Sequence, residues 1–213
     1  MSKTAHFIYI LLLSAIVIAT LVYIVYSGFS YYITSVGERP FHLNHVILKP
    51  SGVLGHGFGI IGSLFMLLGV GLYMSRKRFR VLYRFGILKH WLEFHIFLCT
   101  LGPILVLFHT SFKFGGLVAV SFWSMVAVFI SGIIGRFIYI QIPRAVDGRE
   151  LSDDEVIVTI KDGSVEKRMK RLALMKDLFK YWHVAHLPFA LVMLIIMIIH
   201  VIVTIVFGYR WIF

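Results

Sequence analysis

Four histidines form two pairs with the same spacing. His95 and His109 lie in one strongly apolar stretch, His186 and His200 lie in another, and the members of each pair are 14 residues apart. On an α-helix 14 residues rise ~21 Å and complete nearly four turns, so both members of a pair lie on nearly the same face, at two depths of a bilayer. Polar rings are costly in lipid, and two such helices side by side would offer two pairs of imidazoles. The spacing predicts two haems, each with an imidazole on either side of its iron.

The composition indicates a membrane protein. Hydrophobic residues make up 59% of the chain and charged residues 15%, whereas roughly 25% charged residues are usual in soluble domains. Five apolar segments are each near the ~20 residues that are needed to cross the hydrocarbon core. They are residues 6–27, 53–74, 91–111, 116–140 and 183–208.

These segments predict an all-α integral membrane protein with five transmembrane helices, namely a four-helix haem-binding bundle and an N-terminal anchor helix. The apolar run of residues 7–26 is longer than the core of a signal peptide, so residues 1–27 are interpreted as a retained transmembrane anchor. Residues 28–213 are interpreted as the di-haem domain, which carries a cytoplasmic insert at residues 141–181.

The basic residues are unevenly distributed. Lys3, six basic residues in 76–89 and ten in 136–180 fall on one side of the expected topology, which is 17 of the 21 lysines and arginines. The positive-inside rule therefore predicts a cytoplasmic N-terminus and an outer C-terminus in a bacterial-type inner (plasma) membrane. The net charge of +11 is interpreted as a topology signal and not as a sign of nucleic-acid binding, because the basic residues flank the apolar segments.

This topology predicts how the histidines pair. The third and fifth segments both run from inside to outside, so they are parallel and match in depth. His95 is then expected to face His186 on the cytoplasmic side, and His109 to face His200 nearer the outside, with the two sites ~20 Å apart along the membrane normal. Such an arrangement could carry electrons across the bilayer.

The remaining histidines have less specific interpretations. His90 and His183 lie about 100° away from the deeper histidines around their helices, so they are expected to reach lipid headgroups, with contact to a haem propionate or a quinone as the alternative. For His56 three roles are open: lining a propionate or quinol pocket, ligating a third haem, or facing water. His42 and His45 are expected at the surface of the outer loop.

A glycine stripe follows His56 along the second segment. It consists of Gly52, Gly55, Gly59, Gly62 and Gly69, which recur at three-, four- and seven-residue steps. Such a bare stripe permits the close approach of a neighbouring helix or of a flat porphyrin. The single cysteine, Cys99, is interpreted as a small packing residue, and the lack of a Cys-x-x-Cys-His motif excludes covalent haem attachment of the c type to this sequence.

Two parallel helices that each carry His-x13-His and are separated by one crossing resemble the haem-binding core of the ferric reductase and NADPH oxidase superfamily. They are also similar to the four-helix haem bundle of cytochrome b from quinol-oxidising complexes. The resemblance covers the second to fifth segments and implies that His95 and His186 hold an inner haem b and His109 and His200 an outer one. The charge pattern agrees with the reductases, but no region is large enough for their flavin and nicotinamide domains. Electrons are therefore expected from a partner protein or a quinol.

The polar insert at residues 141–181, and the charged residues Arg136 and Glu93 of the apolar segments, each have more than one possible role. Residues 165–181 predict a basic amphipathic helix, either on the inner leaflet or as a docking surface for a redox subunit, whereas residues 152–160 are compatible with a helix or a strand. Arg136 is a candidate partner for a propionate of the inner haem, or else reaches headgroups. Glu93 is interpreted as an interfacial carboxylate, with proton uptake beside a quinone site as the alternative.

Together these features predict a membrane di-haem b cytochrome. It would carry electrons between a quinone pool or a redox partner, such as an iron–sulfur or multihaem protein, and a second partner in a larger respiratory or photosynthetic complex. Whether the chain is itself an enzyme is open, because the sequence shows no carboxylate pair, nucleophile triad or dinucleotide-binding glycine motif. The alternatives are a stand-alone transmembrane reductase of ferric ions or oxygen, and a non-redox metal or proton transporter subunit.

Overall fold

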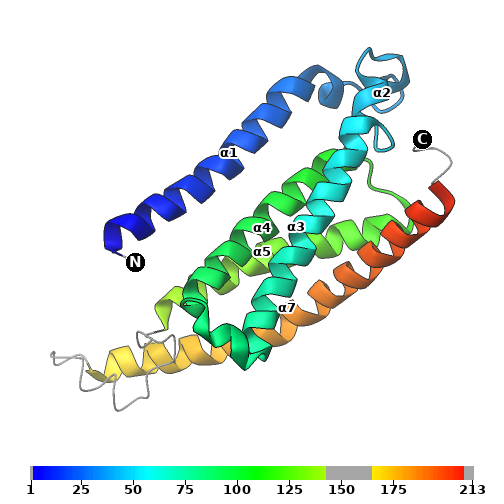
Figure 1. The fold of residues 1–213 in the computed structure, drawn as a ribbon. Helices are drawn as coiled ribbons and strands as arrows, with labels where there is room; N and C mark the ends of the chain where they lie inside the picture. Colours follow the sequence, from blue (N-terminus) through cyan, green and yellow to red (C-terminus); the bar gives the residue numbers. More distant parts are fainter. Residues whose placement is uncertain (1, 143–164, 209–213) are drawn as a thin grey trace. The chain divides into compact units, whose positions relative to one another are not determined.

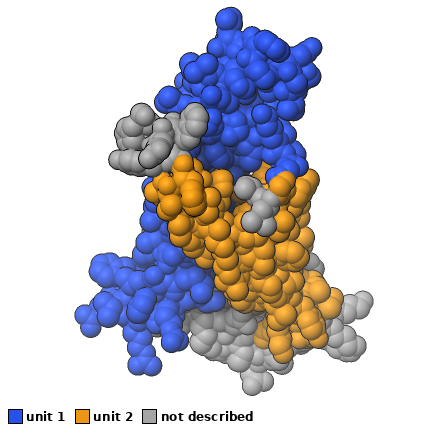
Figure 2. All heavy atoms as spheres, turned by 90° about the vertical axis from the view of Figure 1, so that its right-hand side faces the viewer, with its two compact units in different colours: residues 1–115 blue, residues 116–213 orange. Residues whose placement is uncertain are grey.

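The computed structural model describes residues 2–142 and 165–208, which are helical throughout apart from short connections and contain no strand (Figure 1). The chain divides into two compact units, residues 1–115 and residues 116–213 (Figure 2), and each is described by itself. Unit 1 contains helices α1 (Lys3–Ile33), α2 (His45–Leu48), α3 (Val53–Arg78) and α4 (Leu88–His109), with 3-10 turns η1 (Arg39–Phe41) and η2 (Arg80–Arg84). Unit 2 contains α5 (Gly116–Gln141) and α7 (Val165–Gly208).

Within residues 2–142 and 165–208, five helices are long and apolar enough to cross a membrane, which confirms the predicted helical architecture with five apolar segments. Large apolar side chains are exposed along these helices, for example Phe7 on α1, Leu64 on α3 and Ile202 on α7. Exposed apolar surface on this scale fits lipid as the surrounding solvent.

The helix ends differ from the predicted segments in two places. Helix α1 extends from Lys3 to Ile33, beyond the expected anchor at residues 1–27, and the Ser2 side chain caps it by accepting a hydrogen bond from the Ala5 amide. Helix α7 runs without interruption from Val165 to Gly208, with Pro188 inside it. The predicted basic amphipathic helix is therefore continuous with the last apolar segment. Residues 152–160, for which helix and strand were both open, lie outside the described residues.

In unit 1, α3 and α4 run antiparallel and their backbones approach closely at two glycines. A Cβ atom added to Gly62 would lie 2.8 Å from the Gly102 carbonyl oxygen, and one added to Gly102 would lie 2.8 Å from the Gly62 oxygen. Further along the interface, a Cβ atom on Gly69 would lie 2.9 Å from Cys99 Sγ. Much of the predicted glycine stripe therefore serves helix packing.

Helix α1 packs along α4 and is parallel to it. Ile24 is buried in one core cluster with Leu101, Leu105 and Phe108 of α4. Because α3 is antiparallel to both helices, Lys3 and the basic residues 76–89 lie at one end of unit 1, and Arg39, Lys49 and Lys113 lie at the other. Within this unit, the contacts therefore agree with the expected division of the charges.

Arg39 organises the end of unit 1 that carries few basic residues. It is only 4% exposed, and its guanidinium donates hydrogen bonds to the carbonyl oxygens of Tyr32 and Thr34, each at 2.9 Å, and of Ser111. Ser111 has φ 48° and Phe112 has φ 60°, so the chain reverses through two left-handed residues after α4. The arginine thus joins the end of α1 to the turn after α4.

His42 and His45, which are expected at the surface of the outer loop, are half-buried. They lie against Tyr31, which is fully buried: the His42 ring is 5.5 Å from the Tyr31 ring, and His45 Nδ1 is 3.3 Å from the Tyr31 hydroxyl. Tyr31, near the end of α1, thus contacts both imidazoles, whereas Phe41 of the same loop is 89% exposed.

Adding one methyl group to α3 is expected to have opposite effects at two glycines. Gly62→Ala should lower the free energy of unfolding by about 1–3 kcal/mol, because its Cβ meets the Gly102 carbonyl. Gly71→Ala is the matched control, because nothing lies within 4 Å of its Cβ, and it should be neutral or stabilise by up to about 1 kcal/mol through helix propensity. Thermal unfolding of the two variants in detergent measures the difference, and equal midpoints would contradict the close contact.

Candidate functional site

His95 and His109 both direct a ring nitrogen at the backbone of α3. The Nδ1 atom of His95 lies 2.9 Å from the carbonyl oxygen of Gly69, and that of His109 lies 2.8 Å from the carbonyl oxygen of Gly55. The two acceptors are 14 residues apart, like the two donors, because the antiparallel helices keep one register over this length. One helix pair thus holds two imidazoles in the same way at two levels.

These two hydrogen bonds define the state of each ring. A backbone carbonyl only accepts hydrogen bonds, so each Nδ1 carries a hydrogen and each neutral imidazole carries its lone pair on Nε2. Histidines that ligate metals commonly donate their other ring N–H to a carbonyl in this way, which fixes the ring orientation and raises the basicity of the ligating nitrogen. The donor chemistry of His95 and His109 therefore fits iron ligation through Nε2.

Each of the two rings has its own neighbours on α3 and α4. The Tyr73 ring lies 5.2 Å from that of His95, and Cys99 Sγ lies 3.6 Å from His95 Nδ1. The His109 ring covers Gly59, where a Cβ atom would lie 2.8 Å from Nδ1. The ring of His56 lies 6.5 Å from that of His109, edge to face, so the structure brings this predicted site residue beside the second histidine.

In unit 2, His186 is held by a side chain of α5. Its Nδ1 lies 3.0 Å from Ser131 Oγ, and the Trp182 indole N–H donates to both the carbonyl (2.7 Å) and the hydroxyl (3.0 Å) oxygen of Ser131. The Trp182 ring lies 4.9 Å from the His186 ring and covers Gly135. A hydroxyl both donates and accepts, so this contact orients the ring without defining its tautomer.

His200 and Arg136 are half-buried in unit 2. His200 lies on α7, and its carbonyl accepts a hydrogen bond from Thr204 Oγ1. The Arg136 guanidinium lies 5.8 Å from the centre of the Tyr139 ring on α5. Each predicted pair, His95 with His186 and His109 with His200, takes one histidine from each unit. The pairing and the propionate role of Arg136 therefore stay predictions.

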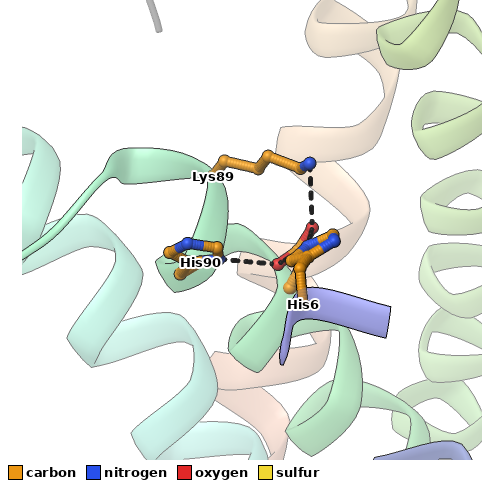
Figure 3. A network of polar contacts seen from close by, with 4 residues as sticks. His6, Lys89 and His90 are labelled. Carbon is orange, nitrogen blue, oxygen red and sulfur yellow. Dashed lines mark hydrogen bonds and ion pairs between the residues drawn. The ribbon is translucent and has the colours of Figure 1, made fainter. Parts of the chain in front are cut away.

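A third group of residues lies where α1 meets the start of α4 (Figure 3). His6 Nε2 lies 2.9 and 3.0 Å from the two carboxylate oxygens of Glu93, His90 Nδ1 lies 3.0 Å from one of them, and Lys89 Nζ lies 3.9 Å from the other. Glu93 is 4% exposed, so it is buried among basic groups, and its position at the membrane interface stays a prediction.

Sequence reasoning missed His6, Trp182 and Ser131. His6 lies near the start of the first apolar segment, and its distance from Glu93 along the chain gives no hint of their contact. The signal for Trp182 was more accessible. It precedes His186 by one helical turn, and Ser131, Gly132 and Gly135 supply the small residues of α5 against which an indole can lie.

The tautomers of His95 and His109 can be measured directly. In protein labelled with 15N-histidine, both rings should show a protonated Nδ1 and an unprotonated Nε2, which is the less common neutral form in water. Solid-state NMR of the diamagnetic protein, with His95→Gln and His109→Gln for assignment, reads the chemical shifts of both nitrogens. A hydrogen on Nε2 and none on Nδ1 would contradict the two carbonyl hydrogen bonds.

No protein-family model matches the chain, and no curated protein or solved structure matches it. The resemblance to the ferric reductase superfamily and to cytochrome b therefore stays a prediction that rests on the histidine spacing.

Proposed function

We propose that this chain is a membrane di-haem b cytochrome that transfers electrons as one subunit of a larger redox complex. His95 and His186 ligate one haem and His109 and His200 the other. The observation that carries the proposal is the pair of hydrogen bonds from His95 and His109 to the carbonyls of Gly69 and Gly55. They give both imidazoles the state that an iron ligand needs, at two positions ~21 Å apart along one helix.

The same hydrogen bonds argue against a proton relay through these rings. A histidine that relays protons exchanges them at both nitrogens, so each nitrogen needs a partner that can take up or deliver a proton. A backbone carbonyl does neither. A ring whose Nδ1–H is bound to a carbonyl is suited instead to bind one group through Nε2 and to keep its orientation while doing so.

In this proposal each residue has a defined task. The imidazoles ligate, the α3 carbonyls and Ser131 orient them, and the apolar side chains of the helices keep water away from the sites. A bound haem supplies one-electron chemistry at each level. His56, whose ring lies 6.5 Å from that of His109, is the proposed contact to a propionate or a quinol at the outer level, and Arg136 is the proposed partner for a propionate at the inner level.

The proposed assembly is an integral subunit of a bacterial-type plasma membrane, with its N-terminus in the cytoplasm. Its electrons come from, or go to, a quinone or a partner such as an iron–sulfur or multihaem protein. The support for this orientation is the excess of basic residues at one end of unit 1 and in the connection between α5 and α7.

Spectra of the purified protein test the proposal. Produced with an adequate haem supply, the protein should show b-type bands in the reduced-minus-oxidised spectrum and two haems per chain by pyridine haemochrome assay. His95→Ala and His186→Ala should each remove one haem, leaving the same residual spectrum and midpoint potential. His109→Ala and His200→Ala should each remove the other haem.

His42→Ala is the matched control, because this histidine lies in the loop between α1 and α3 and should leave both haems in place. Absence of b-type bands in folded protein would contradict the function. Loss of the same haem by His95→Ala and His109→Ala would contradict the assignment of the ligands to two levels.

A further inference from the structure

His6, His90 and Glu93 form a cluster that the proposed haem sites do not use (Figure 3). His6 comes from α1, and His90 and Glu93 lie three residues apart on one face of α4. One imidazole nitrogen from each histidine and a carboxylate oxygen of Glu93 all lie within 4.8 Å of one another. In the described part of the chain this is the one group of three such ligands.

The cluster has a buried side and an open side. The Glu93 side chain is 2% exposed, whereas those of His6 and His90 are 27% and 30% exposed. A buried carboxylate is costly unless positive charge or hydrogen bonds compensate it. The two imidazoles supply the hydrogen bonds to the carboxylate, and they are themselves partly exposed.

We propose that His6, His90 and Glu93 bind a divalent transition-metal ion of the zinc type. Two imidazole nitrogens and one carboxylate oxygen are a ligand set that zinc uses in proteins, with the fourth tetrahedral position open to water. The partial exposure of both histidines provides that open position. The site is separate from the haem ligands, so the inference does not depend on the proposed electron transfer.

The ligand atoms need only local movement to receive the ion. Metal–ligand bonds of about 2.0–2.2 Å at tetrahedral angles place neighbouring ligand atoms about 3.3 Å apart. Glu93 Oε2 lies 3.0 Å from both His6 Nε2 and His90 Nδ1, so these two separations must widen by a few tenths of an ångström. The two imidazole nitrogens, which lie within 4.8 Å of one another, must come to the same spacing. The hydrogens on His6 Nε2 and His90 Nδ1 move to the other ring nitrogen or to water, and the ion takes their place.

Lys89 allows a test against the simplest alternative, in which the cluster binds no metal and only stabilises the contact between α1 and α4. Its Nζ lies 3.9 Å from Glu93 and its side chain is 49% exposed. A lysine that compensates the carboxylate charge would oppose a metal ion, since like charges repel. Replacing it with an uncharged residue should therefore strengthen metal binding, whereas the rival arrangement binds no ion in either form.

Zinc binding to the full chain tests the inference. The protein is purified in detergent through a tag without histidine, freed of bound metal by dialysis against a chelator, and titrated with zinc chloride in equilibrium dialysis with elemental analysis. The wild type should bind one zinc tightly. His6→Gln and His90→Gln should each raise the Kd at least tenfold, Lys89→Met should lower it, and His42→Gln should leave it unchanged.

Zinc-edge X-ray absorption of the wild type should show a nitrogen and oxygen shell with two imidazoles, and this measurement holds even if a variant fails to fold. Zinc binding that both His6→Gln and His90→Gln leave unaltered would overturn the proposal, as would a shell without two imidazoles or the lack of a tight site. The haem content of the same samples, measured separately, shows whether the proposed function fails with it.

Discussion

The close approach of the α3 and α4 backbones is the constraint on which unit 1 depends. Where Gly62 faces Gly102, no side chain separates the helices, and the same short distance lets imidazoles on α4 reach carbonyl oxygens on α3. A helical carbonyl already accepts one hydrogen bond within its helix but has a second lone pair. Side chains usually cover that lone pair, and the absence of one at Gly55, Gly59 and Gly69 leaves it accessible. Histidine orientation and helix packing therefore have the same cause.

In unit 2 a histidine is also held in one orientation, but by a side chain and not by a backbone carbonyl. Ser131 provides a side-chain partner for His186 where unit 1 uses a carbonyl, and Trp182 fills the space over Gly135 that a closer helix would otherwise occupy. The indole N–H holds Ser131 through two contacts, so the serine is itself oriented by the helix that carries the histidine. In both units a histidine is fixed by small residues on the preceding long helix and flanked by an aromatic ring.

The sequence predicted the features that depend on one helix at a time. Apolar length located the five long helices, the glycine spacing located the face of α3 that meets α4, and His-x13-His located two levels on α4 and on α7. It did not predict contacts between distant elements, such as His6 with Glu93 or Arg39 with Ser111, because periodicity assigns a residue to a face without naming the neighbour. The sequence pattern did not predict that α7 is one continuous helix, because the change from polar to apolar composition near residue 182 suggests a boundary. An α-helix can continue through such a change, since its backbone hydrogen bonds do not depend on the polarity of the side chains.

Arg39 has a consequence for how the chain is made. Its guanidinium is buried against carbonyls of α1, which are synthesised before it, and against Ser111, which is synthesised 72 residues later. Until α4 and the turn after it have been synthesised, the arginine lacks one of its three carbonyl acceptors. The hydrogen bonds at the end of α1 are therefore complete only after the third long helix has been made. The first helix of the chain therefore gains its last hydrogen-bonded contact at this end only after α3 and α4 have been synthesised.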